Sequence, residues 1–110
     1  MKKAVIYTRV SSKLQADEGH GLEGQEVVCR SYAELKQYEV IKVFYDRGIS
    51  GGITDRPAMI ELLKFLDEQA EEIVVIFDDI KRFARDIQGH FFLKKEISSR
   101  RGIIESPNHK

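Results

Sequence analysis

The sequence predicts one α/β domain, a three-layer sandwich in which helices flank a central, mostly parallel β-sheet. Apolar stretches alternate with segments of helical periodicity, in the order strand, helix, strand, helix, strand, helix, strand. The stretch Ile73–Phe77 (IVVIF) is apolar throughout, which is typical of a central strand in a parallel sheet. A length of 110 residues allows one domain with a modest core.

Two strands and one helix are predicted in the first half of the chain. Lys2–Tyr7 is a short buried strand, and the polar segment Ser11–His20 that follows is a loop. A helix is expected over Gly21–Gln37, followed by a strand over Val40–Tyr45. On the inward face of this helix we place three side chains at offsets of four and seven: Val28, Tyr32 and Leu35.

The second half begins with a glycine-rich loop, DRGISGGITDRP. Pro57 lies in the first turn of the next helix, which Thr54 or Asp55 is expected to cap. After Ile73–Phe77, a helix over Asp86–Arg100 and a strand beginning at Ile103 complete the pattern. The inward side chains of these two helices are predicted to be Met59, Leu62, Leu63 and Leu66 in the first, and Leu93 and Ile97 in the second.

Bulk composition excludes several classes of protein. The 18 basic and 18 acidic residues cancel, but eight of 10 charged residues in 55–79 are acidic and seven of nine in 81–101 are basic, so a local anion-binding surface remains possible. The single cysteine, Cys29, rules out an internal disulfide or a multi-cysteine metal site, and we expect it to be a small buried side chain. With no signal peptide or membrane-spanning run, the chain is expected to be cytoplasmic.

Three loops should meet beyond the carboxyl ends of the strands, where open α/β sheets bind ligands. They carry guanidinium and hydroxyl groups, and a guanidinium binds phosphate oxygens bidentately. Gln25, on the inward side of its helix, either caps backbone groups or reaches the first loop and orients a site residue. The three loops contribute Arg9, Ser11 and Ser12; Asp46, Arg47, Ser50 and Arg56; and Asp78, Asp79, Lys81, Arg82 and Arg85.

Each of these features also has an ordinary structural explanation. YTRVSS reads as a strand that enters a turn, RFAR as the start of a helix, and Asp78 with Asp79 as its cap. Convergence favours a site, because four like-charged arginines have no structural reason to gather. No Walker-type phosphate loop and no histidine metal spacing is present. A serine without a histidine partner would depend on arginines that stabilise charge on a phosphoryl group.

Five motifs in order, YTRVSS, LEGQE, DRGISGG, TDRPAM and DDIKRFARD, resemble the catalytic domain of the serine site-specific recombinases, the resolvase and invertase family. The residues of these motifs are most similar to those of the large serine recombinases. The resemblance implies a serine that attacks a DNA phosphodiester to form a 5′-phosphoseryl intermediate, followed by strand exchange in a synaptic homotetramer and religation. It implies DNA as the partner, a homodimer in the full-length protein, and no cofactor or metal.

Matched motif by motif, the resemblance makes Ser11 the nucleophile and Ser12 a neighbouring hydroxyl without that role. Gln25 falls on a site glutamine, and Tyr7 on a supporting aromatic. Small resolvases have an aspartate at the position of Lys81, so a similar role for Asp79 is open. The phosphate-binding arginines would be Arg9, Arg56, Arg82 and Arg85.

The resemblance also implies parts that this chain lacks, namely the long dimerisation helix and the DNA-binding domains. We therefore expect residues 1–110 to be a truncated catalytic domain that cannot recombine DNA by itself. Two other classes stay open: a receiver-like signalling module with Asp78 and Asp79 as its acidic site, and a phosphoester hydrolase that uses the arginine cluster. An arginine and a serine at the first strand's end count against the receiver, and the lack of a clear carboxylate and histidine set counts against the hydrolase.

Overall fold

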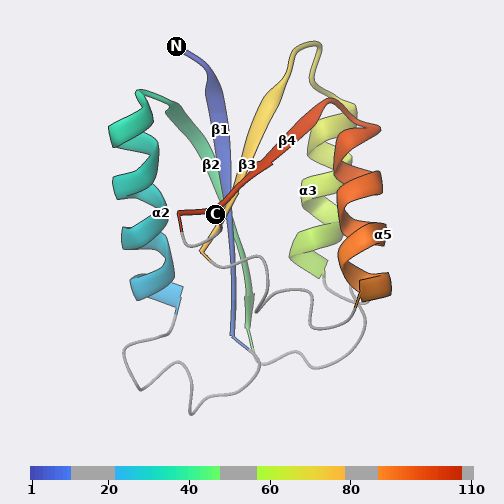
Figure 1. Cartoon of the computed structure of the whole chain (residues 1–110), viewed down its shortest axis with the longest axis horizontal. Coiled ribbons are helices and arrows are strands. Elements are labelled where there is room, and N and C mark those ends of the chain that lie inside the picture. Colours follow the sequence, from blue (N-terminus) through green and yellow to red (C-terminus); the bar gives the residue numbers. More distant parts are fainter. Residues whose placement is uncertain (11–21, 48–56, 79–86, 108–110) are drawn as a thin grey trace.

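The computed structural model describes residues 1–10, 22–47, 57–78 and 87–107, which form four strands and three helices (Figure 1). All strand pairs are parallel, and the strands lie in the order β2-β1-β3-β4. In chain order the elements are β1 (Lys3–Val10), α2 (Leu22–Lys36), β2 (Glu39–Arg47), α3 (Pro57–Asp67), β3 (Ile73–Phe77), α5 (Ile87–Ser98) and β4 (Gly102–Glu105).

Helix α2 covers one face of the sheet, and α3 and α5 cover the other (Figure 1). This arrangement confirms the predicted three-layer α/β sandwich. Strand β3 matches its predicted bounds and lies inside the sheet between β1 and β4, with all five residues buried. The sheet therefore has its apolar centre at β1 and β3, and the carboxyl ends of all four strands point toward the lower side of Figure 1.

The core has two parts, one on each face of the sheet. Under α3 and α5, the predicted inward residues Met59, Leu62, Leu66, Leu93 and Ile97 are buried, and Leu63 packs against them partly buried. Under α2 the cluster is smaller and consists of Ala4, Ile6, Cys29, Ala33, Val74 and Ile76. Cys29 is fully buried as predicted, and burial raises the pKa of its thiol to about 12, so it remains a neutral packing group.

The predicted inward face of α2 is wrong. Val28 is 39% exposed and Leu35 is 81% exposed, and only Tyr32 of that set packs against the core. The face that meets the sheet carries Gln25, Cys29 and Ala33 instead. These are small or polar side chains, so the most apolar stripe of the sequence is not the stripe that α2 buries.

Strands β1 and β2 extend further than the apolar pattern predicts. β1 continues past Tyr7 to Val10, and β2 continues past Tyr45 through Asp46 to Arg47. The assignment of Asp46 and Arg47 to the glycine-rich loop is therefore wrong. Polar residues enter the strands here because the ladder continues to the Val10–Arg47 pair and because Thr8 and Asp46 find hydrogen-bond partners.

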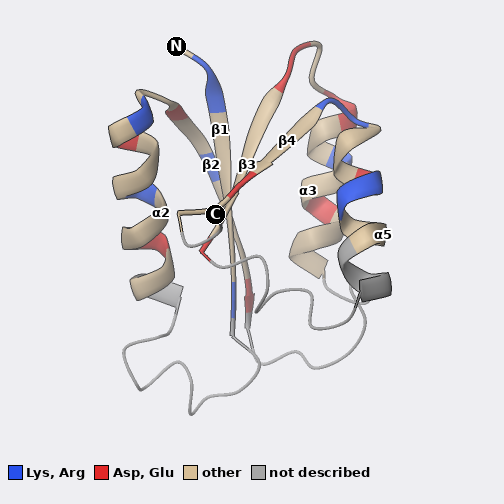
Figure 2. Ribbon diagram, viewed as in Figure 1, with Lys and Arg blue, Asp and Glu red and all other residues tan. Residues whose placement is uncertain are grey.

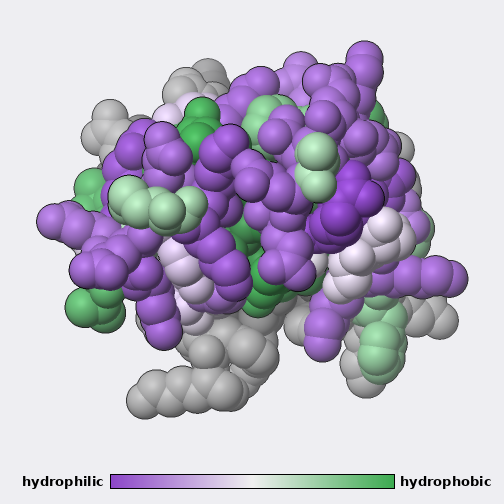
Figure 3. Space-filling view, turned by 90° about the horizontal axis from the view of Figure 1, so that it is seen from above, coloured by the Kyte–Doolittle hydropathy of each residue, from purple (hydrophilic) through white to green (hydrophobic). Residues whose placement is uncertain are grey.

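The remaining helix predictions are met where the structure describes them. α3 begins at Pro57, and α5 spans Ile87–Ser98 within the predicted range. The proposed caps of α3, Thr54 and Asp55, and the loop over Ser11–His20 lie outside the described residues. Viewed toward the amino ends of the strands, the surface of the described residues is largely hydrophilic (Figure 3).

Candidate catalytic edge of the sheet

The candidate site lies at the carboxyl edge of the sheet, where β1, β2 and β3 end. Arg9 of β1 is in register with Asp46 of β2, so opposite charges stand on neighbouring strands near this edge (Figure 2). Asp78 follows the last residue of β3 directly. Of the residues that the sequence analysis places at this edge, the structure describes Tyr7, Arg9, Gln25, Asp46, Arg47 and Asp78. The others lie outside the described residues: Ser11, Ser12, Ser50, Arg56, Asp79, Lys81, Arg82 and Arg85.

Gln25 holds the end of β1 through both polar atoms of its amide. The backbone N–H of Arg9 donates to Gln25 Oε1 at 3.0 Å, and Gln25 Nε2 donates to the carbonyl oxygen of Arg9 at 2.8 Å. The register between β1 and β3 ends at Tyr7 and Phe77, so Gln25 takes the backbone groups of a residue beyond that pairing. The interpretation that the amide binds backbone groups is confirmed, and the backbone is that of Arg9, for which a site role is predicted.

Asp46 is a buried anchor that connects β1, β2 and α3, and it is only 2% exposed. Its carboxylate accepts the hydroxyl of Tyr7 at 2.5 Å. It also accepts the backbone N–H groups of Ala58 at 3.0 Å and Met59 at 3.3 Å. These are the second and third residues of α3, so Asp46 acts as a cap for that helix from a neighbouring strand, with a negative charge at the positive end of the helix.

Sequence reasoning placed Asp46 in a loop and gave it no role. One signal could have indicated it: Pro57 has no N–H, so the first free donors of α3 are those of Ala58 and Met59, and they require an acceptor. Tyr7, which was expected to be a supporting aromatic, is 1% exposed and reaches the same carboxylate. Its ring also packs against Phe77, with a centroid distance of 5.7 Å.

A hydrogen bond at the surface also joins α2 to β2. The hydroxyl of Tyr45 donates to Glu26 Oε1 at 2.5 Å, and Arg30 Nε donates to Glu26 Oε2 at 2.6 Å. These hydrogen bonds lower the pKa of Glu26, which stays ionised over the neutral range. Gln25 and Glu26 therefore attach consecutive positions of α2 to β1 and β2, and this fixes the first turns of the helix over the sheet.

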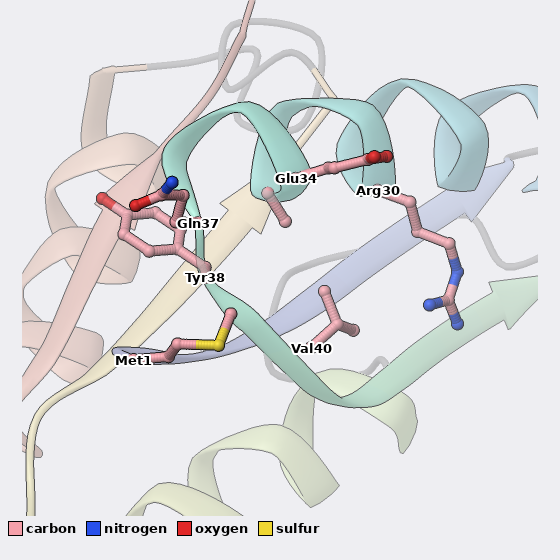
Figure 4. Close-up of a pocket in the computed structure, with 7 residues that line it drawn as sticks. Met1, Arg30, Glu34, Gln37, Tyr38 and Val40 are labelled. Atoms are coloured by element: carbon pink, nitrogen blue, oxygen red, sulfur yellow. The ribbon is translucent and has the colours of Figure 1, made fainter.

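The surface hollow in Figure 4 is not part of this edge. It lies between the second half of α2 and the start of β2, and its lining residues are Met1, Arg30, Ala33, Glu34, Gln37, Tyr38 and Val40. Within the described parts of the chain, no three His, Cys, Asp or Glu side chains gather closely enough to bind a metal ion. In the same residues, no helix combines the length and apolar character needed to cross a membrane.

Comparison with known proteins identifies relatives of this fold and sequence. The family model described as "Resolvase, N terminal domain" matches residues 4–107. A candidate DNA recombinase of Bacillus subtilis (strain 168) is 30% identical over 95 residues, which is 86% of this chain and 18% of the relative. The chain thus spans less than a fifth of the length of that protein.

Two crystal structures have the same fold at similar identity. The N-terminal catalytic domain of TP901-1 integrase is 31% identical, with a TM-score of 0.85 over 97% of this chain and 79% of that one. The C-terminal catalytic domain of ISC1926 TnpA, an IS607-like serine recombinase, is also 31% identical, with a TM-score of 0.78 over 98% of this chain and 71% of that one.

Proposed function

Because the chain belongs to the resolvase family of recombinase catalytic domains, we propose that it cleaves and rejoins DNA with Ser11 as the nucleophile. In the proposed step, Ser11 Oγ bonds to the phosphorus of a DNA phosphodiester as the bond to the 3′-oxygen breaks. The proton lost by the serine balances the one gained by the leaving 3′-hydroxyl. The 5′-phosphoseryl ester conserves the bond energy, so religation needs no cofactor.

We assign charge stabilisation in this step to four arginines: Arg9, Arg56, Arg82 and Arg85. Guanidinium groups stay charged at any working pH and present paired donors to phosphoryl oxygens. Arg9 belongs to β1, and the other three belong to the segments that follow β2 and β3 in the sequence. Open α/β sheets bind ligands beyond the carboxyl ends of their strands, which supports the assignment. The same proposal includes a supporting role for Asp79, in place of the aspartate that small resolvases have at the position of Lys81.

The observation that best supports the proposal is the pair of hydrogen bonds between Gln25 and the backbone of Arg9. A buried amide binds both backbone groups of the arginine that lies two residues before the proposed nucleophile. Catalysis by preorganised charge requires such fixed positions, because groups that are already oriented need no reorganisation during the reaction. Asp46 supplies a similar restraint for α3, whose first residue directly follows Arg56.

The test uses the full-length protein and a DNA that contains its recombination site. We expect a covalent protein–DNA complex that survives denaturation, and we expect Ser11→Ala to abolish it. Ser12→Ala is the matched control, because it removes the same group one residue away and should leave the complex in place. A covalent complex with Ser11→Ala would refute the assignment. Cleaved DNA without attached protein would favour the phosphoester hydrolase.

The assembly state and the limits of this chain are part of the proposal. We infer a homodimer that forms a synaptic homotetramer on DNA, as the family resemblance implies. Phosphate contacts at the active site position DNA without reading its sequence, so the rest of the protein would supply site recognition. We therefore expect the 110-residue chain alone not to recombine DNA.

A further inference from the structure

Ser106 holds the end of β3 by a side-chain hydrogen bond. The register between β3 and β4 ends with the pair Ile76 and Glu105. Just beyond it, Ser106 Oγ donates to the carbonyl oxygen of Asp78 at 3.0 Å, and Ser106 is only 9% exposed. The hydroxyl therefore fixes the residue from which the chain leaves β3.

Glu105 fixes the position of Ser106 in turn. Its carboxylate accepts the hydroxyl of Tyr32 at 2.6 Å and that of Tyr38 at 2.9 and 3.1 Å. Tyr32 belongs to α2, and Tyr38 follows the end of that helix. The carboxyl end of β4, a strand of four residues, is thus attached through its last residue to α2 and through the next residue to β3.

The same arrangement occurs three times at this edge of the sheet. Gln25 binds the backbone of β1 beyond its pairing with β3, Asp46 binds the first free backbone N–H groups of α3, and Ser106 binds the backbone just past β3. Each contacted residue lies within two positions of a proposed site residue in the sequence: Arg9 is one itself, Ala58 is two residues after Arg56, and Asp78 directly precedes Asp79. Gln25 is the family's site glutamine by resemblance, whereas Ser106 belongs to none of the motifs.

We propose that Ser106 is a positioning residue for DNA cleavage, and that it acts by holding Asp78, from which the chain continues to Arg82 and Arg85. This inference rests on the proposed function. Without the hydroxyl, the carbonyl oxygen of Asp78 would lose this hydrogen bond. The segment that carries the two arginines would then begin at a less restrained residue. Arginines that are misplaced by a fraction of an ångström stabilise the transition state less, while ground-state contacts to DNA elsewhere are unaffected.

The test measures single-turnover formation of the covalent complex by the full-length protein at saturating DNA. We expect Ser106→Ala to slow the reaction by about 10- to 100-fold while DNA affinity changes by less than about twofold. Ser106→Thr keeps the hydroxyl and should recover most of the rate. Ser99→Ala is the matched control, because Ser99 Oγ donates to the carbonyl oxygen of Glu96 at the same 3.0 Å but lies exposed after α5.

Three results would overturn the inference. Ser106→Ala could react within about threefold of the parent protein, as Ser99→Ala should. Affinity and rate could fall in the same proportion, which would show general damage to the fold. Ser106→Thr could be as slow as Ser106→Ala, which would show that the hydroxyl is not the cause. A parent protein that forms no Ser11-dependent complex would instead refute the proposed function, so the two failures are distinguishable.

Discussion

Replacing Asp46 with alanine tests whether this carboxylate holds the carboxyl edge of the sheet together. The change removes the acceptor of one buried hydroxyl, that of Tyr7, and of two backbone N–H groups, those of Ala58 and Met59. The side chain is 2% exposed, so water cannot take its place without rearrangement of the neighbouring chain. The variant should therefore lose much more stability than a surface substitution.

The expected loss follows from the separate contacts. Loss of a helix cap costs about 1 kcal/mol, and loss of a hydrogen bond to a charged acceptor costs about 1.5–3 kcal/mol. Together they predict that the free energy of unfolding falls by about 2.5–4 kcal/mol, out of roughly 5–15 kcal/mol for a domain of this size. Asp46→Asn keeps one acceptor oxygen and should lose about half as much.

Urea unfolding followed by circular dichroism measures this loss. Glu61→Ala is the control, since Glu61 is an exposed acidic residue on the same helix and its replacement should cost under about 0.5 kcal/mol. A double-mutant cycle with Tyr7→Phe should give a coupling energy of about 1–2 kcal/mol. A loss below about 1 kcal/mol for Asp46→Ala, or strict additivity with Tyr7→Phe, would refute the reasoning.

Two further predictions concern β4 and its neighbours. A Cβ on Gly102 would lie 2.3 Å from Ile97 Cγ2 and 2.9 Å from the Ile97 carbonyl oxygen. Gly102→Ala should therefore lower the free energy of unfolding by about 1–3 kcal/mol and reduce the midpoint of thermal unfolding. An unchanged midpoint would mean that β4 can move away from α5. Burial, reinforced by the hydrogen bond to Glu105, raises the pKa of Tyr32 to about 12, so the folded state holds this proton more tightly than the unfolded state. The free energy of unfolding should therefore fall as the pH rises from about 10 to 12, and that of Tyr32→Phe should fall less steeply. Urea unfolding at several pH values measures this, and an equal dependence on pH in both proteins would contradict it.

How far the sequence predicts the fold depends on how completely each element is apolar. β3 and α3 were predicted well because their buried positions are all apolar and, except for Ala58, large. The inward face of α2 was not, because Gln25 is polar and Cys29 and Ala33 are small, while Leu35 is apolar and yet 81% exposed. A periodicity argument chooses the most hydrophobic stripe, and it fails where a helix packs closely on a sheet through small residues.

The residues of the candidate site also differ in how far the sequence predicts them. The resemblance of short motifs selected Tyr7, Arg9 and Gln25, and the structure joins Arg9 and Gln25 by two hydrogen bonds. Their roles in a site stay a prediction. The role of Asp46 was missed because Asp, Arg and Gly in succession are typical of a turn. Local composition does not reveal that the carboxylate has a partner 12 residues further along the chain. Contacts of this kind depend on the tertiary arrangement of strands, which no single segment encodes.

The anchors Gln25, Asp46 and Ser106 also explain why polar residues are buried at this edge. Apolar packing is non-directional, so it can hold a strand in the sheet but cannot fix how the chain leaves the strand. Hydrogen bonds to backbone groups are directional, and a buried polar atom that loses its partner costs more than the bond itself contributed. If this edge presents several guanidinium groups to one phosphate, as we propose, polar anchors in the rigid elements would oppose the repulsion among the cations.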